Sequence, residues 1–128
     1  MAYEIGSKGV AEATVLRETT AKAVGSGNLL VFSTPHMIAL MEEAACQCVK
    51  QWLEEGSATV GTKIDIEHLS ATPVGMAVRA EATLTAAEGR KLCFTVEAYD
   101  EKGLIGKGTH ERFLIFEEKF LAKTYDKL

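Results

Sequence analysis

This sequence contains few cysteines and no long hydrophobic run. The three cysteines, Cys46, Cys48 and Cys93, are an odd number without the spacing of a disulfide framework. This predicts free thiols in a reducing compartment, with Cys46 and Cys48 as small core residues and no metal site. No hydrophobic run approaches the length of a membrane span, and the N-terminal residues lack a hydrophobic leader segment. These absences predict a cytoplasmic protein without a membrane partner.

An excess of positive charge is also absent. The formal net charge is -4 at pH 7, whereas a nucleic-acid-binding protein needs a basic face. A few well-placed Lys or Arg residues could still hold a phosphate group. The length of 128 residues suits a single domain, residues 1–128, with one hydrophobic core.

One long helix is predicted between residues 35 and 54. Ser33-Thr34-Pro35 is typical of a helix start, with a hydroxyl cap followed by a proline whose missing N–H is not needed there. Apolar residues then cover more than an ordinary amphipathic stripe, so we expect a helix that is buried on most sides. Gly56 is expected to end it. Residues 23–28, which are rich in glycine, are expected to form a flexible loop before it.

Strand-like segments lie on both sides of this helix. One covers about 10–17, and four follow the helix at about 58–70, 76–86, 91–100 and 104–116. Short turns separate the last three, as in antiparallel hairpins. Residues 117–128 form a charged amphipathic tail that could add a closing helix. A sheet with one apolar face and one mostly apolar helix predict an α+β protein in which the sheet curls around the helix.

Two adjacent carboxylates lie in the middle of the predicted helix. Glu43 shares a face with Gln47 and Lys50, so we interpret it as part of a solvent-exposed stripe. Glu42 lies on the less polar side, where a carboxylate is costly unless it has a partner or a function. Glu42 is therefore a candidate general base or nucleophile.

Two further residues could act with Glu42, although each also has a structural interpretation. His68 ends a strand whose alternation turns it toward the core or toward a cleft at the edge of the core. Thr34 precedes the helix and could simply cap it. His36 and His110 lack such a context, so we expect them to be structural or surface residues.

Three segments together resemble the fluoroacetyl-CoA thioesterase branch of the hotdog superfamily. They are residues 32–42, 60–68 and 71–75, within a resemblance that runs from about residue 29 to 116. That family carries a Thr, Glu, His triad, with the threonine just before the central helix. Thr34, Glu42 and His68 match all three residue types and both spacings.

The resemblance implies a hotdog fold, in which an antiparallel sheet wraps around one long helix, and an acyl-CoA thioesterase activity. It implies catalytic roles for Thr34, Glu42 and His68 and substrate-binding roles for Arg112, Gly61 and Thr62. Glu42 would be the nucleophile or the general base, His68 would polarise, protonate or position water, and Thr34 would donate a hydrogen bond. Backbone N–H groups at the helix start could bind the oxyanion. A homodimer with the site at the subunit interface is also implied.

One departure from the family concerns specificity. The specialised fluoroacetyl enzyme has a phenylalanine-bearing lid before the helix, whereas residues 22–28 here contain no aromatic residue. We therefore predict general hydrolysis of small or medium acyl-CoA esters. Two alternatives remain open. A hotdog enoyl-CoA hydratase would need an Asp and a His near the helix start, where only His36 is present, and a non-catalytic acyl-CoA or lipid-binding module would bind without turnover.

Overall fold

The computed structural model describes residues 3–128. Within this range the chain forms five strands and three α-helices, in the order β1 (Lys8–Thr14), α1 (Ala21–Val24), α2 (Thr34–Val49), β2 (Ser57–His68), β3 (Ala77–Glu88), β4 (Lys91–Asp100), β5 (Gly103–Phe116) and α3 (Glu117–Tyr125). Short 3-10 helices at Arg17–Thr19 and Lys50–Trp52 precede α1 and follow α2. The predicted α+β class, with a long helix followed by an antiparallel meander, is confirmed.

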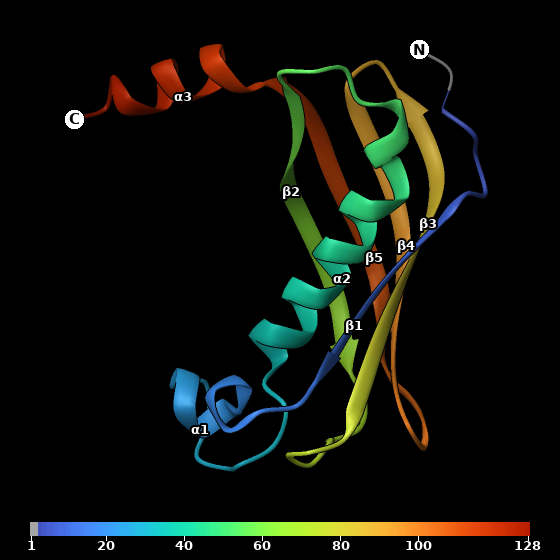
Figure 1. Cartoon of the computed structure of the whole chain (residues 1–128), viewed down its shortest axis with the longest axis vertical. Coiled ribbons are helices and arrows are strands. Elements are labelled where there is room, and N and C mark those ends of the chain that lie inside the picture. The colour runs from blue at the N-terminus through green and yellow to red at the C-terminus, as the bar shows by residue number, and fades with distance from the viewer. Residues whose placement is uncertain (1–2) are drawn as a thin grey trace.

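The strands form one antiparallel sheet in the order β1-β3-β4-β5-β2, so β1 and β2 are its edges. Figure 1 shows α2 running across one face of this curved sheet. The helix packs mainly against β1 and β3 and only lightly against β2. The β2 side of this face is therefore the more open one.

The core lies between α2 and the middle of the sheet. Every second residue of β3 from Val78 to Leu84 is buried, as the alternation of apolar and polar residues predicts. Strand β1 crosses α2 so closely at Gly9 that a Cβ there would overlap backbone atoms of Ala44 and Cys48. Only glycine permits this approach. The buried residues of α2 are Met37, Leu40, Met41, Ala44, Ala45, Cys48 and Val49.

One flank of α2 faces the open side of the sheet. Thr34, Ile38, Glu42 and Cys46 follow each other at four-residue spacing along this flank. Thr34 is exposed and the other three are half-buried. The prediction that both helical cysteines are core residues was therefore wrong for Cys46 and right for Cys48.

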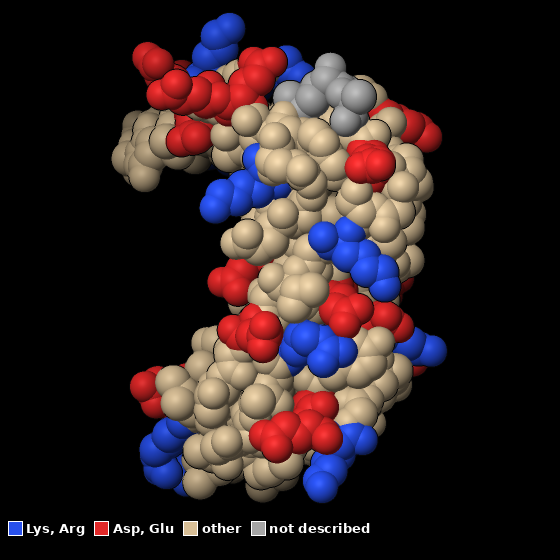
Figure 2. Space-filling model, turned by 45° about the vertical axis from the view of Figure 1, so that its right-hand side comes forward, with Lys and Arg blue, Asp and Glu red and all other residues tan. Residues whose placement is uncertain are grey.

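The C-terminal helix α3 projects from the end of β5 on the side of the β2 edge (Figure 1). All nine of its residues are described and none is buried, and Phe120, Leu121 and Tyr125 are among the exposed apolar side chains. Figure 2 shows that the molecule is concave beneath this helix. One side of the molecule thus presents an open helix flank, a free sheet edge and an amphipathic helix with no buried residue.

The predicted end of the long helix was wrong. Helix α2 ends at Val49, where the chain tightens into the 3-10 helix that carries Trp52. Trp52 packs edge-on against Tyr3, with the ring centroids 5.6 Å apart, and closes one end of the core. Gly56, with φ 84°, belongs instead to the turn that leads into β2.

The predicted loop at residues 23–28 is partly helical. Helix α1 includes its first two residues, because the hydroxyl of Thr20 caps the helix by accepting a hydrogen bond from the N–H of Ala23. Gly25 closes the turn with φ 81°, a left-handed conformation that favours glycine. Within residues 3–128, none of the helices combines the length and hydropathy that crossing a membrane requires.

Candidate active site

Thr34 and His68 form the first half of the predicted site. Thr34 Oγ1 lies 2.7 Å from His68 Nδ1. The helix cap is Ser33, whose hydroxyl accepts a hydrogen bond from the N–H of His36. The Thr34 hydroxyl is therefore not needed for capping and is available to His68. His68 Nε2 is buried and forms no hydrogen bond with any atom of residues 3–128.

The start of α2 offers fewer oxyanion donors than a typical helix N-terminus. A helix normally presents several unpaired N–H groups there. The N–H of His36 donates to Ser33 Oγ, and Pro35 has no N–H group. Among the first three helical residues, only the N–H of Thr34 is left for a developing oxyanion. The expected group of backbone donors is thus reduced to one.

Glu42 belongs to a second cluster with Arg112 and His110. Glu42 Oε2 accepts a hydrogen bond from Arg112 Nη1 at 3.1 Å and lies 4.0 Å from His110 Nε2. Arg112 is 6% exposed and His110 is 1% exposed, whereas the Glu42 side chain is 40% exposed. Glu42 therefore compensates a buried cation and still reaches the open flank of α2.

The neighbouring carboxylate behaves as the sequence predicted. Glu43 is exposed, as are Gln47 and Lys50 on the same face of α2. Glu43 lines a shallow depression on the β1 side of the helix, together with His36 and Ala39. Of the two adjacent glutamates, only Glu42 faces the open side of the sheet.

Within one chain the three predicted catalytic residues are not brought together. Thr34 and His68 are in direct contact, but Glu42 lies eight residues after Thr34 on the same helix. At a rise of 1.5 Å per residue, this spacing corresponds to about 12 Å along the helix axis. The geometry is that of two half-sites along one flank of α2.

Gly61 and Thr62, predicted to bind substrate, lie on β2 beside the second half-site. A Cβ at Gly61 would stand 2.5 Å from Glu42 Oε2 and 3.3 Å from Arg112 Nη1. Any larger residue would therefore displace the Glu42–Arg112 pair. Thr62 falls at a register shift between β2 and β5, and its hydroxyl donates to the carbonyl of Glu111. Such bulges often re-aim side chains next to functional sites.

Two depressions mark the two half-sites. One of about 320 Å³ is lined by Thr34, His68, Phe32, Val31, Ala21 and Ser26, among others. The other, of about 190 Å³, is lined by Glu42, Gly61, Thr62, Lys63, Ile64 and His110. Both lie on the α2 side of the molecule, so a substrate could meet either group of polar atoms there.

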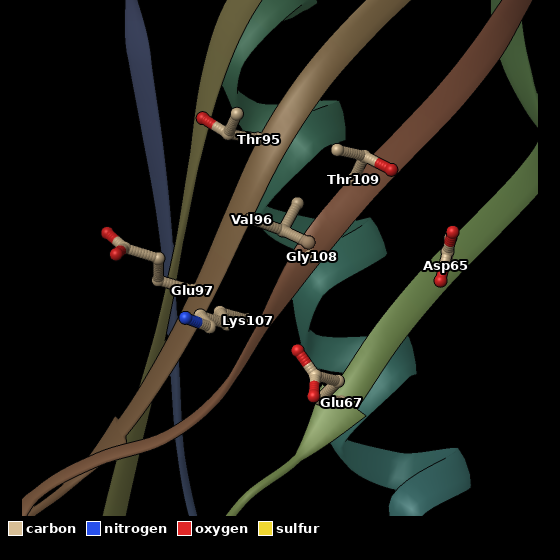
Figure 3. Close-up of a pocket in the computed structure, with 8 residues that line it drawn as sticks. All are labelled: Asp65, Glu67, Thr95, Val96, Glu97, Lys107, Gly108 and Thr109. Carbon is tan, nitrogen blue, oxygen red and sulfur yellow. The ribbon is translucent and has the colours of Figure 1, made fainter.

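A larger hollow, of about 530 Å³, lies on the opposite face of the sheet (Figure 3). Its rim carries Asp65, Glu67, Glu97 and Lys107, and α2 lies behind the strands that bear them. None of the predicted site residues lines it. Among residues 3–128, no group of three or more His, Cys, Asp or Glu side chains could hold a metal ion.

Both histidines of the two half-sites are disfavoured as cations. Burial lowers the pKa of His68 below its usual value. Burial also lowers the pKa of His110, and the positive charge of nearby Arg112 lowers it further. Both imidazoles are therefore neutral at pH 7, and each can accept a hydrogen bond through one nitrogen.

The comparison with known families decides the relationship of this chain. The family model described as fluoroacetyl-CoA-specific thioesterase (FlK) matches residues 15–118. The chain belongs to this family. A curated relative, the fluoroacetyl-CoA thioesterase of Streptantibioticus cattleyicolor, is 44% identical over 97 residues, which are 76% of this chain and 70% of the relative.

Solved structures of the same family are also similar in shape. A structure of the fluoroacetyl-CoA thioesterase FlK matches with a TM-score of 0.93 and 34% identity, over 100% of this chain and 99% of that chain. A thioesterase superfamily member from Thermus thermophilus matches with a TM-score of 0.90 and 31% identity, over 98% and 93% of the two chains. The predicted hotdog fold and the predicted class of thioester hydrolase are confirmed.

In this member of the FlK family, sequence reasoning missed the contact of His110 with Arg112 and the role of Thr59. Arg112 donates from Nε to Thr59 Oγ1 at 2.8 Å and from Nη2 to the Thr59 carbonyl at 2.9 Å. One signal was available. His110 and Arg112 are two residues apart on a strand, so they share one face of β5. That this face meets Glu42 follows only from the fold.

Proposed function

We propose that this protein hydrolyses small or medium acyl-CoA thioesters to the free acid and CoA, with Glu42, His68 and Thr34 as catalytic residues. Arg112, Gly61 and Thr62 would line the binding site. The observation that carries this proposal is the pairing of Thr34 with His68 at 2.7 Å, next to a helix flank on which a partly exposed, arginine-bound Glu42 also lies. These are the donor and base that thioester hydrolysis needs.

We propose that the working enzyme is a homodimer in which each site takes Thr34 and His68 from one subunit and Glu42 from the other. Ile38 lies midway between Thr34 and Glu42 on the open flank of α2. If two copies of α2 pack antiparallel about a two-fold axis near Ile38, Thr34 of each copy faces Glu42 of the other. The buried Nε2 of His68, which needs an acceptor or donor, would then find one.

Two further features support this dimer. Strand β2 is a free edge of 12 residues, and a second copy would cover it. Helix α3 overhangs the same concave side, with Phe120 and Leu121 exposed (Figures 1 and 2). A partner in this concavity would bury them.

The three cysteines are free, which supports our proposal that the protein acts in the reducing cytoplasm.

The proposed reaction uses water as the nucleophile. Glu42 accepts a proton from the water that attacks the thioester carbonyl, while Arg112 holds Oε2 of Glu42 and leaves the other carboxylate oxygen for the water. The N–H of Thr34 would donate to the oxyanion that forms, while the Thr34 hydroxyl stays bound to His68. The carbon–sulfur bond then breaks, and the proton that Glu42 took from water passes to the sulfur, so that CoA leaves as the thiol.

The residues before α2 bear on acyl specificity. The segment that the family resemblance assigns to an aromatic lid is formed here by α1 and the loop after it. Its exposed apolar side chains are aliphatic, with Val24 39%, Leu29 69% and Leu30 42% exposed. An aliphatic pocket discriminates by only about 1–3 kcal/mol per methylene group, so we propose a broad acyl preference.

We expect the purified protein to release free thiol from acetyl-, butyryl-, hexanoyl- and fluoroacetyl-CoA, with rates that change gradually along the series. Thiol release is followed with a chromogenic disulfide, and each rate is divided by the rate of the same ester with hydroxide. A protein that binds these esters without turnover over hours would support the binding-module alternative instead. Hydration of crotonyl-CoA without thiol release would support the hydratase.

A further inference from the structure

His110 is held in one protonation state by its two neighbours. Its Nδ1 lies 2.7 Å from the carbonyl oxygen of Lys63, which can only accept a hydrogen bond, so Nδ1 carries the proton. Its Nε2 lies 3.1 Å from Arg112 Nη1, and a guanidinium can only donate. Nε2 is therefore the bare acceptor nitrogen. Both contacts agree on a single neutral tautomer.

The acceptor nitrogen of His110 completes the binding of Arg112. The guanidinium donates to Thr59 Oγ1 and the Thr59 carbonyl on one side and to His110 Nε2 on the other. Its remaining contact is with Glu42 Oε2 at 3.1 Å. Three of the four other N–H donors are engaged by Thr59 and His110, which holds the planar guanidinium in one orientation. In that orientation Nη1 also faces Glu42.

The packing around His110 leaves little room for its side chain to move. His110 is buried between strands and stacks on Phe94, with the ring centroids 6.0 Å apart. On the opposite side, a Cβ at Gly61 would stand 3.3 Å from His110 Cε1. These contacts enclose the imidazole on two sides, and its hydrogen bonds to Lys63 and Arg112 set its orientation.

We propose that His110 is a positioning residue for hydrolysis: as a neutral hydrogen-bond acceptor it fixes the guanidinium of Arg112, which in turn orients the carboxylate of Glu42 toward the substrate. This inference rests on the proposed function, in which Glu42 acts on the substrate. It gives a role to a histidine that the sequence analysis predicts to be a structural or surface residue. His110 itself touches no reacting atom. Its effect should appear in kcat and not in the affinity for acyl-CoA.

Two substitutions separate the two nitrogens. His110→Gln can place an amide oxygen near the former Nε2 and so keep an acceptor for Arg112. His110→Asn can keep a donor near the former Nδ1 for the Lys63 carbonyl, but its shorter side chain cannot reach Arg112. Phe94→Leu is the matched control, because it weakens the packing of the imidazole and leaves its polar contacts in place.

We expect kcat for acetyl-CoA to fall about tenfold or more in His110→Asn, with KM changed by less than about threefold, since one hydrogen bond to a charged group is lost. His110→Gln should recover most of this loss, and Phe94→Leu should lower the urea midpoint without lowering kcat. Imidazole ¹⁵N spectra of the wild-type protein at pH 7 should show a protonated Nδ1 and a bare Nε2 for His110.

Equal kcat values in the Gln and Asn variants, or a protonated Nε2, would overturn the role of His110. Such a result in an enzyme that still releases thiol would leave the proposed function intact. A wild-type protein that releases no thiol from any ester would instead overturn the proposed function, and the inference would fall with it. The urea midpoints show whether each variant is folded, so loss of fold cannot be mistaken for loss of positioning.

Discussion

Glu42→Gln should lower kcat for acyl-CoA hydrolysis by about two orders of magnitude or more, the usual contribution of an acid–base group. The amide keeps the size of the side chain and can still accept the hydrogen bond from Arg112. It loses the negative charge and the basicity that a water-activating residue needs. Initial rates at saturating acetyl-CoA measure the effect, and urea unfolding shows whether the variant is folded.

The matched control is the adjacent carboxylate. Glu43→Gln makes the same chemical change one residue away, on the exposed stripe of α2. It should leave kcat within about twofold of wild type, because a surface substitution without partners has small effects. Similar losses at both positions would show that Glu42 was the wrong choice.

His68→Ala should also lower kcat by about two orders of magnitude. The substitution removes the partner of the Thr34 hydroxyl and the buried Nε2 together. Thr34→Ala, which removes only one hydrogen bond, should cost less. A His68 variant with wild-type kcat would exclude the imidazole from the chemistry and leave it a structural role.

The wild-type enzyme should also show the titration of His68. Because burial lowers the pKa of His68 below its usual value of about 6.5, the imidazole is neutral at pH 7. The value of kcat/KM should therefore be level near pH 7 and fall as the pH drops below about 6.5, when protonation removes the acceptor. A fall that begins above pH 7 would contradict the neutral imidazole.

The sequence was sufficient for the order of the main elements and for the position of Glu43 on the exposed face of the helix. Helical spacing alone puts Glu43 with Gln47 and Lys50 on the exposed face, and the structure agrees. It could not decide between Ser33 and Thr34 as the helix cap, because both carry a hydroxyl at the helix start. The structure shows Ser33 capping and Thr34 bound to His68.

Long-range contacts were beyond the reach of sequence patterns. Arg112 is 70 residues from Glu42, and only the pairing of β5 with β2 and the path of α2 bring them together. Periodicity gave no reason to connect His110 with either residue. The packing of Trp52 against Tyr3, which lies near the other end of the described chain, is another contact that no local pattern could predict.

The most direct test of the two-subunit site is a heterodimer made from Glu42→Gln and His68→Ala chains, purified through two different tags. Each variant alone should be nearly inactive. The heterodimer combines the intact His68 and Thr34 of one chain with the intact Glu42 of the other, so we expect about half of the wild-type kcat per dimer from one restored site. A heterodimer as inactive as its two parents would show that Glu42 and His68 must come from the same chain.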